Sequence, residues 1–243
     1  ATLADVRQSA KAFDSFQQAL TPYKEILDLW VSQYFGNRDA LEFLSLFSTD
    51  VLPALTGKLK VASKYQQAIE AARQLREEKR FFHWDLEFPE VFVDLRGRDW
   101  AQNGGFDAVI GNPPYLSAPA MVQDIPDERD CLSKMHSNLL VMKWDLYCAF
   151  LTKSWELLAK NSSGLGLIIP NQFLYQDYAQ KLRQKFASDS TITSISLGLK
   201  PNCLLSISVS FPIPWNIPQS SNIFLPFFNV SRCLEPVTVL AAP

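Results

Sequence analysis

The chain has 243 residues, of which 47% are hydrophobic and 20% charged, values typical of a soluble protein long enough to bury a core. Its formal net charge of −2 gives no strongly basic balance of the kind that marks whole nucleic-acid-binding chains, although a local patch would suffice. The sequence has no run of about 18 apolar residues and no signal-peptide core, so we expect no membrane span and a cytoplasmic location. The four cysteines form no C-x-x-C pair, which predicts reduced thiols and no metal site.

Residues 1–80 are predicted to form helices. Apolar residues from Tyr23 to Tyr34 recur at i, i+3, i+4, i+7 spacing, which is one stripe of a helix that Gly36 is expected to end. The stretch SKYQQAIEAARQLREEKR is rich in strong helix formers, with Ser63 as the expected N-cap and a cationic end that suits a helix C terminus. We therefore interpret these residues as a helical N-terminal segment.

From Phe81 the pattern changes toward an α/β domain. Residues 81–95 are aromatic and β-branched and contain Pro89, which predicts an extended, partly buried segment broken at the proline. Residues 117–140 contain prolines and charges and are expected to be a loop. Apolar runs alternate with helix patterns in the order FDAVIG, KWDLYCAFLTKSWELLAK, GLGLIIP, DYAQKLRQKFAS, TITSISLG. This order predicts a mainly parallel α/β sheet with right-handed crossovers.

The first of these strands runs directly into Asn112, Pro113, Pro114 and Tyr115. Ligands of open parallel sheets bind beyond the C-terminal ends of the strands, so this loop is a candidate site. The prolines stiffen the loop and remove two backbone donors, while Asn112 offers an amide oxygen and Tyr115 a flat face. The Asn112 oxygen and the Pro113 carbonyl, beside an aromatic plane, suit the exocyclic amino group of a planar base. The alternative is a plain tight turn, because Asn-Pro often opens one.

The same part of the chain resembles a known family. FHWDLEFPEVF, GGFDAVIGNPPYL, DLYCAF and GLGLIIPNQFL followed by YAQKLRQKF resemble, in that order, the amino-group DNA methyltransferases of bacterial restriction-modification. The similarity is in particular to type IIG methylase–endonuclease polypeptides and their relatives in phage-exclusion systems, and it spans most of residues 20–198. It implies a partial Rossmann-like class I methyltransferase fold, S-adenosyl-L-methionine as cofactor, double-stranded DNA as partner, and methylation of adenine N6 after base flipping.

The resemblance also implies a role for each residue of the loop. Asn112 and the Pro113 carbonyl would hold the N6 amino group, Pro114 would shape the loop, and Tyr115 would stack on the base. Because the amino lone pair is delocalised into the ring, two acceptors that pull the nitrogen toward tetrahedral geometry would free it to attack a methyl group. These four residues are the predicted catalytic set, and this chemistry needs no metal ion.

Five further residues have weaker functional interpretations. Asn171 and Phe173 follow the end of the second strand, so they are expected at the edge of the same cleft. His83 would line that cleft, although aromatic-rich segments such as the one around it more often form core. Asp107 either starts the first strand, the interpretation we favour, or lies near the cofactor. Asp145 opens a predicted helix, where a carboxylate suits the helix dipole.

The sequence departs from the family in two places. The family's cofactor loop is a glycine-rich turn, commonly D-P-x-x-G-x-G, and none of the nine glycines of this chain lies in such a context. After Pro201 the chain is rich in proline and poor in charge, so it can hardly continue a regular central sheet and is a candidate for out-of-frame translation. We therefore expect a fragment with a helical insertion at 1–80, the catalytic half at 81–200 and a divergent tail at 201–243. Its partners would be the missing N-terminal half and a target-recognition domain.

Two alternative functions remain open at this point. A docking fragment that holds DNA or a partner chain without binding a cofactor would also explain the missing glycine loop. A protein glutamine N5-methyltransferase acting on release factors also uses an NPPY sequence, on an amide nitrogen. That enzyme would need a glycine-rich loop upstream of NPPY, and the FHWDLEFPEVF stretch favours the DNA methyltransferases.

Overall fold

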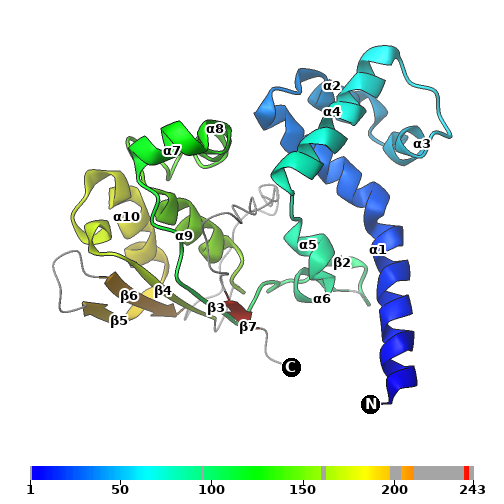
Figure 1. Ribbon diagram of the computed structural model, residues 1–243. Coiled ribbons are helices and arrows are strands. Elements are labelled where there is room, and N and C mark those ends of the chain that lie inside the picture. Colours follow the sequence, from blue (N-terminus) through cyan, green and yellow to red (C-terminus); the bar gives the residue numbers. More distant parts are fainter. Residues whose placement is uncertain (1, 95, 160–162, 198–203, 211–237, 241–243) are drawn as a thin grey trace. The chain divides into compact units, whose positions relative to one another are not determined.

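The computed structural model describes residues 2–94, 96–159, 163–197, 204–210 and 238–240 (Figure 1). These residues belong to two compact units, the first ending at Glu87 and the second beginning at Phe88. Each unit is described by itself. None of the helices in the described ranges combines the length and apolar character needed to cross a membrane.

The first unit is helical, as the sequence predicts for residues 1–80. Its elements are α1 (Leu3–Ser32), the 3-10 turn η1 (Gln33–Phe35), α2 (Arg38–Phe47), α3 (Val51–Leu55), α4 (Ser63–Lys79) and α5 (Trp84–Glu87). The predicted stop at Gly36 is confirmed, because this residue has a left-handed φ of 91°. Arg76 and Lys79 lie in the last turn of α4, which confirms its cationic end. The N-cap prediction is wrong by one residue: Ala62 is the cap, and Ser63 is the first helical residue.

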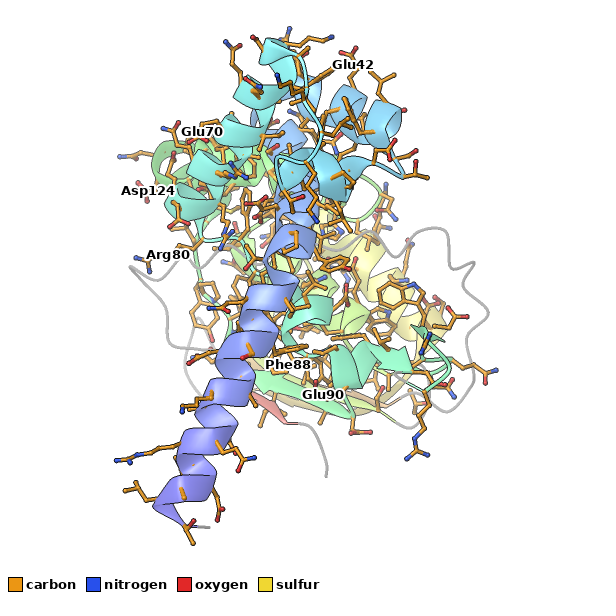
Figure 2. All side chains as sticks on the ribbon, turned by 90° about the vertical axis from the view of Figure 1, so that its right-hand side faces the viewer. Glu42, Glu70, Arg80, Phe88, Glu90 and Asp124 are labelled. Carbon is orange, nitrogen blue, oxygen red and sulfur yellow. The ribbon has the colours of Figure 1, made fainter. Side chains whose placement is uncertain are left out.

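The core of the first unit lies between the second half of α1 and the helices α2, α3 and α4. Its largest buried members are Leu29, Phe43, Leu55, Tyr65 and Ile69. The first half of α1 is exposed on all sides, and Figure 2 shows its side chains pointing outward into solvent. The predicted stripe from Tyr23 to Tyr34 is buried only in part: Val31 is buried and Ile26 packs against this core, whereas Tyr23 stays 48% exposed. Leu29, which lies outside the predicted stripe, is buried in the core, and each such buried apolar side chain contributes about 1.5–3 kcal/mol.

Two proline-containing segments were predicted to be non-helical, and both predictions are wrong. The segment predicted to be extended, residues 81–95, forms α5 and α6 (Pro89–Phe92) and is a strand only at β1 (Val93–Asp94), which pairs antiparallel with β2 (Asp99–Trp100) after the segment. The predicted loop holds α7 (Ala118–Asp124) and α8 (Pro126–Met135). In α6, α7 and α8 a proline stands in the first two helical positions. A missing N–H costs nothing there, so these prolines start helices instead of breaking them.

The remaining helices of the second unit follow the predicted alternation. They are α9 (Leu146–Glu156), the 3-10 turns η2 (Asn171–Leu174) and η3 (Asp177–Ala179), and α10 (Gln180–Asp189). The strands are β3 (Ala108–Gly111), β4 (Gly164–Pro170), β5 (Thr191–Leu197), β6 (Leu204–Ser210) and β7 (Thr238–Leu240). The strand–helix–strand–helix–strand order from Phe106 is thus confirmed.

The five strands form one sheet in the order β5-β6-β4-β3-β7. Strands β3 and β4 are parallel neighbours, with Gly111 opposite Leu167. The expectation that the segment after Pro201 cannot continue the sheet is wrong for β6, which pairs antiparallel with both β4 and β5 and separates them. Its stretch LLSISVS contains no proline, so every residue keeps its backbone donor. β7 adds an antiparallel edge beside β3.

Helices α9 and α10 cover one face of this sheet (Figure 1). That face presents the buried side chains of Val109, Leu165, Leu167 and Ile169. The ring of Phe186 on α10 stacks on Trp155 of α9, with 4.5 Å between ring centroids. On the opposite face Ile110 and Ile168 each remain 41% exposed. The packed face therefore fixes the carboxyl ends of β3 and β4, where the candidate site lies.

Candidate functional site

The NPPY loop leaves the carboxyl end of β3, as the sequence predicts. Pro113 and Pro114 are buried, whereas Asn112 and Tyr115 are exposed, Tyr115 to 45%. The buried prolines fix the backbone of the loop because their φ angles are locked. The polar amide and the aromatic ring are therefore the exposed side chains of the loop.

The hydroxyl of Tyr115 ties the loop to the neighbouring strand. Its single hydrogen faces two acceptors, the carbonyl oxygen of Ile168 in β4 at 3.1 Å and the Oδ1 atom of Asn112. Burial raises the pKa of Tyr115, so the hydroxyl remains a protonated donor at neutral pH. These two contacts orient the ring and place it beside the Asn112 amide.

The residues after Tyr115 are held by the start of α9. The N–H of Leu146 donates to the carbonyl of Leu116 at 2.9 Å, and the N–H of Ala118 donates to Oδ1 of Asp145 at 2.8 Å. Asp145 does open the helix as its N-cap, but its carboxylate makes no capping bond to α9. The sequence offered no signal for this contact, because it joins residues 27 positions apart.

The two residues predicted from the end of β4 lie in different surroundings. Asn171 directly follows β4 and is partly exposed, at the same edge of the sheet as Asn112. Phe173 is 3% exposed, and its ring packs against Phe186 with 6.1 Å between centroids. A substrate contact remains a prediction for both residues, and the burial of Phe173 favours a packing role for that ring.

Asp107 lies at the opposite end of β3 from the NPPY loop. It precedes the strand, and its backbone carbonyl accepts the N–H of Gly164 at 2.9 Å. The five residue steps from Asp107 to Asn112 correspond to about 16 Å of extended chain. The position fits the strand-start interpretation, and its cofactor role stays a prediction.

His83 belongs to the first unit and is buried there. Its Nε2 atom lies 2.7 Å from Oδ1 of Asp28, and both side chains are 2% exposed. Nη1 of Arg76 lies 3.7 Å from the other oxygen of Asp28. This buried cluster gives His83 a structural partner, so the predicted substrate contact is not needed to explain the residue.

The glycines with positive φ in the described ranges do not lie in a strand-to-helix turn of the kind that holds a nucleoside cofactor. Gly36 and Gly57 have positive φ angles, but each lies at the end of a helix with open space around it. At Gly105 a Cβ atom would strike the backbone of Leu158 and Ala159, so close packing explains that residue. Within the same ranges no group of three or more potential metal ligands comes together.

Comparison with known proteins gives a consistent match. Residues 23–197 match the family model described as Eco57I restriction-modification methylase. A type II restriction enzyme and methyltransferase of Escherichia coli is 36% identical over 98 residues, which is 40% of this chain and 10% of that protein. A type II methyltransferase of Geobacillus stearothermophilus is 35% identical over 85 residues, which is 35% of this chain and 14% of that protein.

A putative type II restriction enzyme and methyltransferase of Methanocaldococcus jannaschii is 30% identical over 92 residues, 38% of this chain and 6% of that protein. In each of these three relatives the matched stretch is at most 14% of the protein's length. The match over residues 23–197 includes the NPPY loop and the start of α9.

Proposed function

Because this chain belongs to the Eco57I restriction-modification methylase family, we propose that it serves in methylation of adenine N6 in DNA, within restriction-modification or phage defence in the cytoplasm. The observation that carries the proposal is the NPPY loop at the carboxyl end of β3. Its prolines are buried, while its amide and its aromatic ring are exposed side by side. A planar base with an amino group matches both exposed groups.

In this proposal Asn112, Pro113 and Tyr115 contact the base, and Pro114 shapes the loop. The Asn112 oxygen and the Pro113 carbonyl accept the two hydrogens of the N6 amino group and draw its lone pair out of the ring plane. The Asn112 oxygen receives the Tyr115 hydroxyl in the free protein, so the amino group replaces that donor. The hydroxyl keeps the Ile168 carbonyl as its acceptor, and Tyr115 stays oriented for stacking.

S-adenosylmethionine would supply the methyl group, as the methyltransferase relatives suggest. The described residues do not fit that cofactor, since none of their glycines with positive φ lies in a strand-to-helix turn. We therefore assign to this chain the holding and orienting of the base, and no step that passes through the cofactor. A partial Rossmann-like methyltransferase sheet, completed by another part of the enzyme, is consistent with the parallel pair β3 and β4.

The base-holding role can be tested with a pair of labelled DNA duplexes. One carries adenine opposite an abasic site, and the other carries hypoxanthine, whose carbonyl replaces the N6 amino group. We expect the chain to bind the adenine duplex about 5- to 150-fold more tightly. The hypoxanthine carbonyl cannot donate to the two acceptors of the loop, and leaving acceptors without a donor costs about 1–3 kcal/mol. Fluorescence anisotropy measures both affinities.

The Asn112→Ala variant should lose most of this preference, because it removes one of the two acceptors. Asn138→Ala is the matched control, since Asn138 is exposed and lies outside the loop. Equal affinity of the wild-type chain for the two duplexes would refute the proposed role of the loop.

A second candidate is a DNA- or partner-docking role without cofactor binding. The absence of such a glycine turn among the described residues favours it for the isolated chain. Calorimetric titration with S-adenosylmethionine separates the two. Micromolar binding would exclude the docking role as the whole function. No heat of binding, together with adenine preference, would indicate a base-holding half that requires a cofactor-binding partner.

A further inference from the structure

The carboxylate of Asp145 bridges two segments that meet near the candidate site. Its Oδ1 atom accepts the N–H of Ala118 at 2.8 Å, and its Oδ2 atom accepts the hydroxyl of Tyr178 at 2.9 Å. Ala118 begins α7 only three residues after Tyr115, and Tyr178 lies in η3, shortly after the end of β4. A single side chain thus connects the exit of the NPPY loop with the segment that follows the neighbouring strand.

The usual role for an acidic residue at this position does not explain Asp145. It is the N-cap of α9 and has the extended backbone of a cap, with φ −90° and ψ 155°. An N-cap carboxylate ordinarily accepts from the N–H groups of its own helix, but that side-chain bond is absent here. Both oxygens are instead used by residues of other elements, so the carboxylate organises tertiary structure.

The surroundings of Asp145 hold the carboxylate in place. The Tyr178 hydroxyl also lies 3.2 Å from the hydroxyl of Tyr147, which is fully buried. Burial raises the pKa of both tyrosines, so both hydroxyls stay protonated. On the other side, Arg129 of α8 donates to the carbonyl of Trp144 at 3.0 Å and lies 4.6 Å from the centre of its ring. The residue before Asp145 is therefore fixed as well.

We propose that Asp145 is a positioning residue that holds the exit of the NPPY loop through Ala118 and so keeps the Asn112 and Tyr115 side chains aligned for a base. The entry of the loop is already fixed by β3 and by the bond from Tyr115 to Ile168. The bond from Asp145 fixes the other end, and a bond between a carboxylate and an N–H is among the stronger ones in proteins. The importance of this alignment for a base rests on the function proposed above.

The first test measures the loop itself and needs no substrate. In Asp145→Ala, hydrogen exchange of the peptide covering residues 112–121 should accelerate about tenfold or more, because the Ala118 N–H loses its acceptor. Asp145→Asn keeps an oxygen for Ala118 and an amide that can donate to Tyr178, so its exchange should stay within about threefold of wild type. Asp124→Ala is the control, because Asp124 is an exposed carboxylate on α7 (Figure 2).

The Asn variant separates positioning from a purely electrostatic role at the helix terminus. A dipole role requires the negative charge, so it predicts that Asn behaves like Ala. Accelerated exchange in Asp145→Asn equal to that in Asp145→Ala would therefore overturn the proposal. If Asp145→Ala does not fold, the nearly isosteric Asp145→Asn is compared with the wild type alone, and an acceleration of its exchange by about tenfold or more would overturn the proposal.

The second test uses the adenine and hypoxanthine duplexes. Asp145→Ala should lose most of the adenine preference, while Asp145→Asn and Asp124→Ala should keep it. Retention of the full preference in a folded Asp145→Ala with a loosened loop would refute the alignment role. If the wild-type chain shows no preference, the proposed function has failed, and the exchange experiment still decides whether Asp145 holds the loop.

Discussion

Two substitutions at Tyr115 should separate the contribution of its ring from that of its hydroxyl. The ring is 45% exposed, so a base can cover its free face, and stacking of one base on an aromatic side chain is worth about 1–3 kcal/mol. Tyr115→Ala should therefore weaken binding of the adenine duplex about 5- to 150-fold. Tyr115→Phe keeps the ring, and its adenine affinity should stay within about threefold of wild type.

The hydroxyl should instead contribute to stability. Tyr115→Phe removes the hydrogen bond to the Ile168 carbonyl, which should cost about 0.5–1.5 kcal/mol in urea unfolding. Tyr23→Ala is a matched control, because Tyr23 is 48% exposed and belongs to α1 in the other unit. Anisotropy titrations of the four proteins give the affinities. If Tyr115→Ala binds the adenine duplex within about twofold of wild type, the stacking role is refuted.

Three predictions concern the second unit. Gly105→Ala should destabilise the protein by at least about 2 kcal/mol in urea unfolding, because the φ of 142° and the nearby backbone of Leu158 both disfavour a Cβ atom; an unchanged midpoint would contradict this. Burial lowers the pKa of His136 in the folded protein, so as the pH falls the unfolded chain binds the proton at a higher pH than the folded chain does. The free energy of unfolding should therefore decrease as the pH is lowered from about 7 to about 5. That loss should be smaller in His136→Gln, and equal losses would exclude His136 as the cause. Burial raises the pKa of Cys131 and Cys148 to about 12, so neither thiol should react with a thiol reagent in the folded protein. In a variant with Cys203 and Cys233 replaced by serine, mass spectrometry should detect labelling only after unfolding.

The sequence alone was sufficient for features that depend on local patterns. The N-terminal helix, the short apolar runs and the alternation of strands with helices all follow from side-chain periodicity, and the structure has them. The order of the NPPY loop and the motifs around it indicated the family, which the match over residues 23–197 confirms. The position of the loop after a strand also follows from sequence, because a buried run that ends in two prolines cannot continue pairing.

The errors in the predicted helices arose at prolines, because a proline can either break a helix or start one. Pro89 was interpreted as a break, and the prolines of residues 117–140, among them Pro119 and Pro126, as signs of a loop. Each of the three stands at the start of a helix. Proline is compatible with both positions, and the choice depends on whether the following residues can pack as a helix. The same limit applies to β6, whose place between β4 and β5 depends on pairing partners far away in the chain.

Tertiary structure alone decided which residues share an environment. His83 pairs with Asp28 across 55 positions, and the Asp145 carboxylate accepts from Ala118 and Tyr178, which lie on different elements. No periodicity encodes such partners, because a hydrogen bond between distant residues depends on how whole elements pack. The sequence thus determined the periodic helices and strands, the family and the position of the NPPY loop at the end of β3. The structure determined which side chains hold that loop, since only packing brings its two ends to β4 and α9.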